Sequence, residues 1–241
     1  MFDLTPFTQT LSALAQRPKH TCLLCHDTTQ GTLNLCEACR QDLPRIHNAC
    51  ARCGLPLPTN APQCGACQRL KLAYRRCFSL FEYRHPVDFA IKAFKHHNSV
   101  QAQRLLCQLM VEASRSLPWQ EWQGLVPVPL HWQKLLKRGF NQAHVLAQSL
   151  HRQNGVSVIS VKRQHTNPAQ QSLNRQQRLN NLRGVFAVND SKTQRLLTGK
   201  NLLIVDDVVT TGATVNALAE VLKQAGAQQV DVLCLARTPS P

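Results

Sequence analysis

The fold is decided by the stretch Leu202-Leu203-Ile204-Val205-Asp206-Asp207-Val208-Val209-Thr210-Thr211-Gly212-Ala213-Thr214. Its uninterrupted apolar start predicts a buried strand over Asn201–Val205, which ends at two carboxylates. A hydroxyl-rich loop then opens directly into an amphipathic helix, expected over Ala213–Ala225. Open α/β sheets bind ligands at the carboxyl ends of their strands, and the free N–H groups of a helix N-terminus hold a phosphate. The junction therefore predicts a phosphate site at the edge of a parallel sheet.

The two carboxylates indicate which part of a ligand lies beside that phosphate. Adjacent negative charges repel a phosphate, so Asp206 and Asp207 are expected to face a sugar. There they would accept hydrogen bonds from vicinal ribose hydroxyls or hold a divalent ion. The loop threonines offer hydroxyl donors, and Gly212 lets the backbone approach the phosphate without a Cβ clash. The plainer alternative is that Asp207 only caps the helix and the threonines form an ordinary turn.

The chain around this junction alternates strand-like apolar runs with helical ones from about residue 78 onward. That alternation is typical of a parallel sheet with crossover helices. The expected strands are Cys77–Tyr83, Gly124–Pro127, Val156–Val161, Asn201–Val205 and Val230–Leu235, and the expected helices are Ser99–Ser116, Gln142–Gln153 and Ala213–Ala225. The sequence therefore predicts an α/β fold for most of the chain.

Eight of the eleven cysteines form four Cys-x-x-Cys pairs that recur every 14 residues. The pairs are Cys22 with Cys25, Cys36 with Cys39, Cys50 with Cys53, and Cys64 with Cys67. Two such pairs complete a tetrahedral shell of four thiolates with no open position, so we expect one or two structural zinc ions. A redox relay and an iron–sulfur cluster are the alternatives. The segments between the pairs hold few apolar residues, so metal binding would supply their stability, about 10 kcal/mol or more per site.

The spacing leaves the ligand sets partly open. Consecutive pairs are the preferred partners, although crossed pairing is also possible. Three histidines are near enough in sequence to replace a cysteine as ligand, namely His20, His26 and His47. Three cysteines fall outside the pattern, namely Cys77, Cys107 and Cys234.

Length and composition predict a small module followed by a larger domain. With 241 residues, 43% of them apolar, the chain is long enough for one α/β domain and an appendage. We expect an N-terminal segment over 1–19, a double zinc ribbon over 20–70 and the α/β domain over 71–241. The N-terminus lacks the pattern of a signal peptide, and no apolar run is long enough to span a bilayer. The expectation is a cytoplasmic protein that does not insert into membranes.

The formal net charge of +15 predicts an anionic ligand or partner. Eight thiolates around two divalent zinc ions would lower this charge by four and leave the chain strongly basic. Residues 122–189 contain nine lysines and arginines and no Asp or Glu, whereas residues 190–241 are balanced. A stretch of one sign concentrates phosphates, whether of a nucleotide or of a nucleic-acid backbone. A generally basic, soluble surface is the plainer alternative.

The junction from Leu202 to Thr214 is similar to the signature of type I phosphoribosyltransferases. The resemblance implies a doubly wound sheet of about five parallel strands. It also implies that Asp206 and Asp207 form the catalytic pair and meet the ribose 2′- and 3′-hydroxyls. The residues that would bind the 5-phosphate are Thr210, Thr211, Gly212, Ala213 and Thr214. The implied ligand is phosphoribosyl pyrophosphate, which arrives with Mg²⁺.

Two further regions extend this resemblance. A second phosphate region would follow the strand at Val126-Pro127-Val128-Pro129, where the segment Arg138-Gly139-Phe140-Asn141-Gln142 suggests a tight turn that presents Arg138. The polar, basic segment Thr166–Phe186 resembles the flexible loop that closes over the pyrophosphate in this fold. The candidate residues of the pyrophosphate clamp are Arg138, Arg175, Arg178 and Arg183.

The order of these motifs along the chain resembles the ComF competence family, from about residue 20 to residue 237. Members are phosphoribosyltransferase-like proteins associated with the uptake and use of external DNA. The resemblance therefore implies a competence function, with single-stranded DNA and a DNA-uptake helicase as partners. One segment, Phe94-Lys95-His96-His97-Asn98, departs from the Lys-Tyr-x-Gly-like turn that is common at this place in the family.

Two functions compete on these observations, and the sequence leaves open whether the protein is an enzyme. The first is a DNA-uptake accessory protein that binds a phosphoribosyl group. The second is an active phosphoribosyltransferase in nucleobase salvage, which needs Mg²⁺, a phosphate clamp and a positioned acceptor base. Only residues 78–100 are expected to cover the pocket, because six residues follow the last expected strand. A third hypothesis, a ligand-sensing regulator, lacks a helix-turn-helix pattern.

Overall fold

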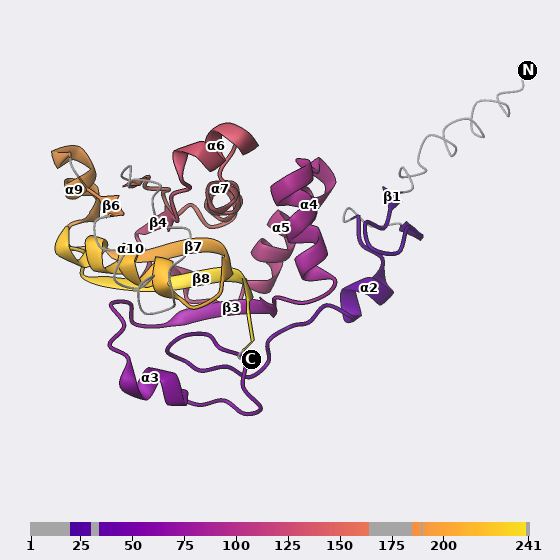
Figure 1. Ribbon diagram of the computed structural model, residues 1–241, viewed down its shortest axis with the longest axis horizontal. Coiled ribbons are helices and arrows are strands. Elements are labelled where there is room, and N and C mark those ends of the chain that lie inside the picture. The colour runs from indigo at the N-terminus through magenta and orange to yellow at the C-terminus, as the bar shows by residue number, and fades with distance from the viewer. Residues whose placement is uncertain (1–19, 30–33, 164–184, 189, 240–241) are drawn as a thin grey trace, which may run out of the picture. The chain divides into compact units, whose positions relative to one another are not determined.

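The structure, a computed structural model, describes residues 20–29, 34–163, 185–188 and 190–239 (Figure 1). The chain divides into two compact units, Met1–Asp42 and Leu43–Pro241. The first unit contains the first two cysteine pairs, and the second contains the other two pairs together with the α/β sheet. No helix in the described ranges is long and apolar enough to cross a membrane. The domain boundaries expected near residues 19 and 70 stay a prediction.

The first unit is small and is organised around its cysteines. Its elements are the antiparallel strands β1 (His20–Thr21) and β2 (Thr28–Thr29) and the short helix α2 (Glu37–Gln41). Cys36 caps α2, because its sulfur accepts a hydrogen bond from the backbone N–H of Cys39. Among the residues described in this unit, the buried apolar side chains are Cys22 and Leu35. A core of this size cannot hold the unit together without metal.

The second unit is built around one parallel sheet. Its strands are β3 (Cys77–Glu82), β4 (Gly124–Pro127), β7 (Asn201–Val209) and β8 (Gln229–Arg237), in the order β3-β8-β7-β4. All three strand pairs are parallel. The central strands β7 and β8 are mostly buried apolar runs, as parallel strands covered on both faces require. The free edge of β3 is partly paired with the preceding chain, where Arg45 forms an antiparallel bridge to Phe81.

Helices cover both faces of this sheet. They are α4 (Val87–His97), α5 (Val100–Ala113), α6 (Trp132–Arg138), α7 (Gln142–Asn154), α9 (Ser191–Leu197) and α10 (Ala213–Gln224). Shorter elements are α3 (Gly65–Arg69), the 3-10 helix η1 (Trp119–Glu121) and the antiparallel pair β5 (Lys162–Arg163) and β6 (Phe186–Ala187). α5 packs against α4 and α7, and α7 also contacts β4 and β7, whereas α10 lies against β7 and β8 (Figure 1).

The connections reverse direction between β4 and β7, and in folds of this kind the carboxyl ends of two such strands border a crevice. After β4 the chain passes through α7 to the segment at Val158, on the far side of β4. After β7 it passes through α10 to β8, in the opposite direction. Right-handed crossovers in opposite directions place α7 and α10 on opposite faces. The fold is therefore doubly wound, and its switch point, where such folds bind ligands, lies between β4 and β7.

The strand expected over Val156–Val161 is reduced to a single bridge. Leu125 of β4 pairs in parallel with Val158, flanked by hydrogen bonds from Leu125 N–H to the carbonyl of Ser157 and from Ile159 N–H to the carbonyl of Leu125. The sheet therefore has four strands in the described ranges instead of about five. β4 itself spans only four residues, so it offers a short edge on which a fifth strand can pair.

β7 is longer than expected and contains both carboxylates. It continues to Val209 instead of ending at Val205, because β8 extends alongside it and pairs Ala236 with Val208 and Arg237 with Val209. The three expected helices are confirmed as α5, α7 and α10, with ends shifted by a few residues.

Candidate functional site

The loop after β7 has the geometry of an anion site. Gly212, the residue before α10, has φ 80° and ψ 0°, a left-handed conformation that glycine adopts without strain. Because Gly212 has no side chain, α10 begins without a hydrogen bond from the side chain of its N-cap residue. Ala213 N–H donates to the hydroxyl of Thr211 at 3.3 Å, a long bond that a better acceptor could replace. Asp206 and residues 208–215 line a hollow of about 30 Å³ at this point.

The two carboxylates have unequal surroundings. Asp206 accepts a hydrogen bond from the backbone N–H of Asp207, and Asp207 accepts one from the N–H of Val208, both at 2.9 Å. Burial raises the pKa of Asp206 well above its ordinary value, and the charge of Asp207 raises it further. No cation pairs with Asp206 among the residues that the structure describes. A ligand that brings hydroxyl donors to this side chain would therefore stabilise its charged form.

Lys95 pairs with the second carboxylate. Its Nζ lies 2.6 Å from Asp207 Oδ2, and both side chains are largely buried. Lys95 stands in the last turn of α4, next to Phe94, whose ring stacks on that of Phe140 with 4.9 Å between centroids. The segment that departs from the family turn thus supplies a counter-ion to the acidic pair. Sequence reasoning missed this role, because a lysine on a helix far away in the chain carries no signal beyond its place in that segment.

The second expected phosphate region lies beside the first. Pro127 of β4 pairs with Val205 of β7, and Val128 N–H donates to the carbonyl of Val205 at 3.0 Å. The turn before α7 is fixed by Asn141, whose amide donates to the carbonyl of Val128 at 3.0 Å and whose side-chain oxygen accepts from Ala143 N–H at 3.0 Å. Both loops therefore border the same crevice.

The expected tight turn at Arg138 is present. Gly139 ends α6 with φ 77°, and Arg138 Nη1 donates to Gln142 Oε1 at 3.2 Å. Gln142 is buried, and its Nε2 has no hydrogen-bond partner among the residues that the structure describes. A buried amide donor without a partner is costly, so Gln142 is a further candidate for ligand contact that its residue type alone did not single out.

Cations gather near this crevice. The pKa of Lys134 is lowered by burial and then by the charges of Arg138, Arg163 and Lys95. Mutual repulsion of this kind is relieved by a bound anion. The guanidinium of Arg163 lies 5.7 Å from the centroid of the Phe186 ring, and its buried Nε has no hydrogen-bond partner within the described ranges.

Part of the expected clamp cannot be located. Arg175, Arg178 and Arg183, with almost all of the expected loop Thr166–Phe186, lie outside the described residues. Arg138 is the one member of the expected clamp in the described part of the chain.

The paired cysteines form two clusters of consecutive pairs. The first cluster is Cys22, Cys25, Cys36 and Cys39, and the second cluster is Cys50, Cys53, Cys64 and Cys67. Within each cluster all four sulfurs lie within 4.8 Å of one another. The sulfurs of Cys25 and Cys36 are 3.6 Å apart, and those of Cys53 and Cys64 are 3.7 Å apart. A tetrahedral zinc with Zn–S bonds of about 2.3 Å separates its sulfurs by about 3.8 Å. The two clusters are therefore consistent with two structural zinc ions.

Backbone N–H groups prepare one thiol of each cluster for metal. Burial opposes the ionisation of Cys22, but hydrogen bonds from the backbone of Cys25 and Cys36 lower its pKa to about 6. Burial likewise opposes ionisation of Cys50, and backbone hydrogen bonds from Cys53 and Cys64 lower its pKa to about 7. The thiolate is the form that binds zinc. Among the described side chains, His26 and His47 belong to neither cluster.

Comparison with known proteins covers both parts of the chain. The Double zinc ribbon domain matches residues 17–68, and the Phosphoribosyl transferase domain matches residues 135–241. Competence protein F of Haemophilus influenzae is 29% identical over 223 residues, which are 90% of this chain and 96% of that protein. DNA utilization protein YhgH of Salmonella typhimurium is 32% identical over 210 residues, 85% of this chain and 90% of that protein. Competence protein ComFC of Streptococcus pneumoniae is 25% identical over 233 residues, 90% of this chain and 99% of that protein.

Proposed function

Because the chain belongs to the ComF/YhgH competence family, with its double zinc ribbon and phosphoribosyltransferase domain, we propose that it binds phosphoribosyl pyrophosphate and serves DNA uptake and utilisation. The relatives named above carry competence or DNA utilization in their names, which supports the second half of this proposal. The first half rests on the crevice between β4 and β7. The thiols of both clusters must stay reduced to bind metal, so we place the protein in the cytoplasm.

The observation that carries the ligand assignment is one strand–loop–helix junction. At one end lies a carboxylate that has no cationic partner in the described part of the chain, and at the other begins a helix that no N-cap side chain caps. The 5-phosphate binds the N–H groups and hydroxyls of Thr210–Thr214. Asp206 accepts a hydrogen bond from one ribose hydroxyl, which stabilises the charged form that burial disfavours. Asp207, held by Lys95, accepts from the other.

The pyrophosphate would lie toward β4. The charges of Arg138 and Arg163 lower the pKa of Lys134 near this side of the crevice, and a pyrophosphate with several negative charges would offset this repulsion. Arg175, Arg178 and Arg183 are proposed as further members of the clamp. Mg²⁺ comes with the pyrophosphate, and it supplies charge neutralisation there.

A second candidate function is nucleobase salvage, which the Phosphoribosyl transferase domain over residues 135–241 favours. In that reaction an acceptor nitrogen bonds to C1 of the ribose as the bond from C1 to the pyrophosphate oxygen breaks. The positive charge that develops on the sugar is stabilised by nearby carboxylates, here those of Asp206 and Asp207.

A contact with single-stranded DNA is proposed from the surface of α6. Trp132 and Leu136 are 45% and 75% exposed, and Lys134 and Lys137 lie on the same short helix. Cations bind a nucleic-acid backbone, and an exposed indole offers a stacking surface for a base. The proposed protein partner, a DNA-uptake helicase, rests on the family alone.

Isothermal titration of the zinc-loaded chain tests the ligand. We expect phosphoribosyl pyrophosphate with Mg²⁺ to bind more tightly than ribose 5-phosphate or pyrophosphate alone, because only the whole ligand occupies both loops. Absence of binding by all three contradicts the proposal. Release of pyrophosphate on addition of a nucleobase would establish the second candidate function. For DNA, affinity for an oligonucleotide should fall steeply with salt if backbone contacts dominate.

A further inference from the structure

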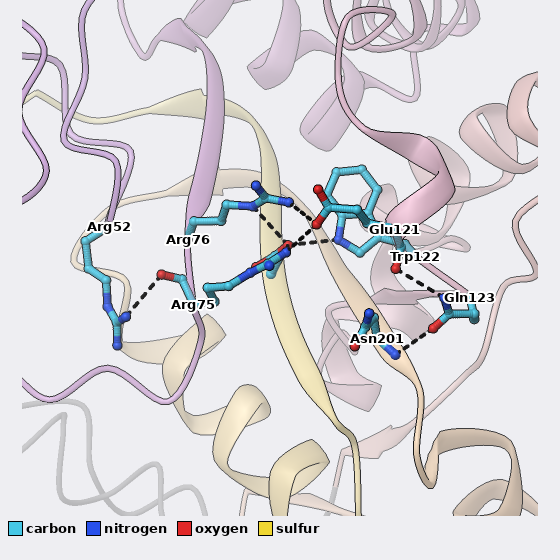
Figure 2. A network of polar contacts seen from close by, with 8 residues as sticks. Arg52, Arg75, Arg76, Glu121, Trp122, Gln123 and Asn201 are labelled. Carbon is cyan, nitrogen blue, oxygen red and sulfur yellow. Dashed lines mark hydrogen bonds and ion pairs between the residues drawn. The ribbon is translucent and has the colours of Figure 1, made fainter.

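The second cluster is built into the sheet of its unit. Arg52 lies in the turn Cys50–Gly54 and donates from Nη2 to the carbonyl of Leu72 at 2.8 Å and from Nη1 to the carbonyl of Arg75 at 3.2 Å. Figure 2 shows Arg52 reaching the main chain at Arg75. One side of the turn is therefore anchored to the segment that leads into β3.

Gly54, at the other side of the same turn, lies in close contact with β3. A Cβ added to Gly54, which has φ +67°, would stand 2.2 Å from Ser79 Oγ and 2.9 Å from the carbonyl oxygen of Cys77. Only glycine fits at position 54, because β3 occupies the space that a side chain would need. The turn is therefore in close contact with β3 and has no room to move toward the sheet. The backbone around Cys53 is thus held in one place when the cluster is complete.

Arg237 joins this turn to the phosphate loop, residues Thr210–Thr214, where the 5-phosphate is proposed to bind. Its Nε donates to the carbonyl of Cys53 at 3.2 Å, and its Nη1 donates to the carbonyls of Val209, at 3.1 Å, and of Thr210. The arginine ends β8 and is only 6% exposed. One guanidinium therefore bonds both to a ligand residue of the second cluster and to the chain just before Thr211–Gly212.

A second connection runs under the loop. Ala73 N–H donates to Asn216 Oδ1, in the first turn of α10, at 2.8 Å. The hydroxyl of Tyr74 lies beneath Gly212, where an added Cβ would stand 3.5 Å from it. Both residues follow Leu72, whose carbonyl Arg52 holds. The loop is thus supported from the cluster side at its start and at its end.

The positive charge of Arg237 links the stability of its position to the metal of the second cluster. Within the described ranges no carboxylate pairs with its buried guanidinium, and an unpaired buried charge is costly. Four thiolates around one zinc ion carry two net negative charges, and the bond from Arg237 to the Cys53 carbonyl places the guanidinium beside them. A loaded second cluster therefore stabilises Arg237 in place.

We propose that Arg237 is a positioning residue that couples metal loading of the second cluster to the shape of the phosphate loop. With metal bound, the turn Cys50–Gly54 and Arg237 hold the carbonyls of Val209 and Thr210, which turns the following N–H groups outward to the phosphate. Without metal the loop loses this support, and phosphate affinity falls. The inference rests on the proposed function of the loop and adds a regulation of it by metal.

Thermodynamic linkage tests this coupling without changing Arg237. In the variant Cys36→Ser/Cys39→Ser the second cluster is the one complete four-cysteine site, so competition with a zinc chelator reports on that cluster. At constant free Mg²⁺, saturating phosphoribosyl pyrophosphate should raise the zinc affinity of the second cluster about tenfold, because coupling between two sites is reciprocal. Equal zinc affinity with and without bound ligand overturns the proposal. Introducing Arg237→Met in the same background should abolish the difference.

Direct substitution gives an independent readout. We expect Arg237→Met to weaken ligand affinity about tenfold and to speed hydrogen exchange at the amides of Thr210–Gly212. Arg237→Lys should weaken affinity less, since an amine keeps the charge and part of the bonding. The matched control is Arg104→Met, an exposed arginine on α5, which should leave both readouts unchanged.

The outcomes separate the two proposals. If the unaltered chain binds none of the ligands, the proposed function fails. If it binds, and Arg237→Met binds equally well with unchanged exchange, the coupling fails while the function stands. Should Arg237→Met not fold, as circular dichroism would reveal, Arg237→Lys and the chelator competition decide.

Discussion

The two ends of the parallel sheet each hold an aspartate, and the surroundings of the two aspartates differ. At the amino end, Asp231 of β8 is 1% exposed, with Arg75 Nη2 at 2.7 Å, Arg76 Nε at 3.1 Å and the Trp122 indole N–H at 2.9 Å (Figure 2). At the carboxyl end, Asp206 of the neighbouring strand β7 has no cationic partner in the described part of the chain. We interpret the complete network at one end as a contribution to the stability of the fold. We propose that the acid at the other end, which has no cationic partner among the described residues, binds a ligand.

Electrostatics express the same difference. Burial alone would raise the pKa of Asp231, but the hydrogen bonds from Arg75 and Trp122 and the charge of Arg76 lower it below the ordinary range. Burial raises the pKa of Asp206, and the charge of Asp207 adds to the effect. Ionisation of Asp231 is therefore favoured at the amino end of the sheet, and ionisation of Asp206 is disfavoured at the carboxyl end.

The largest expected effect is on stability at the amino end. Asp231→Ala leaves the guanidinium groups of Arg75 and Arg76 with the partly exposed Glu121 as their remaining shared partner, and it removes the acceptor of the Trp122 indole N–H. We expect a loss of about 3 kcal/mol in the free energy of unfolding, measured by urea denaturation at neutral pH. Asp88→Asn, which alters an ion pair with an exposed lysine on α4, should change stability much less. Equal losses in the two variants would contradict the structural role of the network.

The pH dependence of stability should have opposite signs at the two ends. Because the folded pKa of Asp231 is lowered, its contribution is present above the unfolded pKa of about 3.9 and is lost as pH falls through the folded value. Because the folded pKa of Asp206 is raised, its cost appears as pH rises above about 3.9 toward the folded value.

Two variants separate these contributions. Asp206→Asn should be more stable than the unaltered chain at pH 7, and the gain should vanish near pH 3, where both states are protonated. Asp231→Asn should be less stable at pH 7 and should have a flatter acid limb. Urea denaturation from pH 3 to pH 8 measures both curves. A loss of stability at pH 7 in Asp206→Asn would show that its carboxylate is structural after all.

An intermediate effect is expected at Lys95. Lys95→Met removes the cation 2.6 Å from Asp207 Oδ2, so the acidic pair repels a phosphorylated ligand more strongly. We expect ligand affinity, measured by titration calorimetry, to fall about tenfold, the order of one charge-assisted hydrogen bond. Lys92→Met, one turn away on the exposed face of α4, is the control and should leave affinity unchanged. Unchanged affinity in Lys95→Met would mean that the ligand does not contact the acidic pair.

The smallest effect is expected at Arg138, and it should be selective. Arg138→Gln removes one cation near β4 while the phosphate loop after β7 stays intact. Affinity for phosphoribosyl pyrophosphate should fall roughly fivefold, and affinity for ribose 5-phosphate should not change. Comparing the two ligands in the same variant excludes a general loss of folding. Equal losses for both ligands would place Arg138 elsewhere in the site.

Local patterns in the sequence predicted the parts of the site that are continuous in the chain. The run from Leu202 to Thr214 contains its own strand, loop and helix, so its geometry follows from apolar patterning and one glycine. The four cysteine pairs likewise indicated metal binding, although the spacing alone left the pairing open. Patterns of this kind report contacts between near neighbours in sequence.

Long-range contacts account for what the sequence could not predict. Lys95 meets Asp207, and Arg237 meets Cys53, across more than a hundred residues in each case. β7 runs past its carboxylates because β8 extends beside it, and Val156–Val161 forms only a bridge because β4 is short. The second cluster is joined to the sheet by Arg52 and Gly54. An arginine or a glycine in a short turn does not by itself predict such a contact.

The central claim is that the acidic end of β7 and the loop after it bind a phosphoribosyl group. Its most direct test is isothermal titration of phosphoribosyl pyrophosphate with Mg²⁺ into the zinc-loaded chain and into Asp206→Asn/Asp207→Asn. We predict saturable binding by the unaltered chain and a loss of affinity of about a hundredfold in the double variant, the product of two charged hydrogen bonds that contribute about tenfold each. The variant should remain folded by circular dichroism. Equal affinity of the two proteins, or no binding by either, would contradict the account.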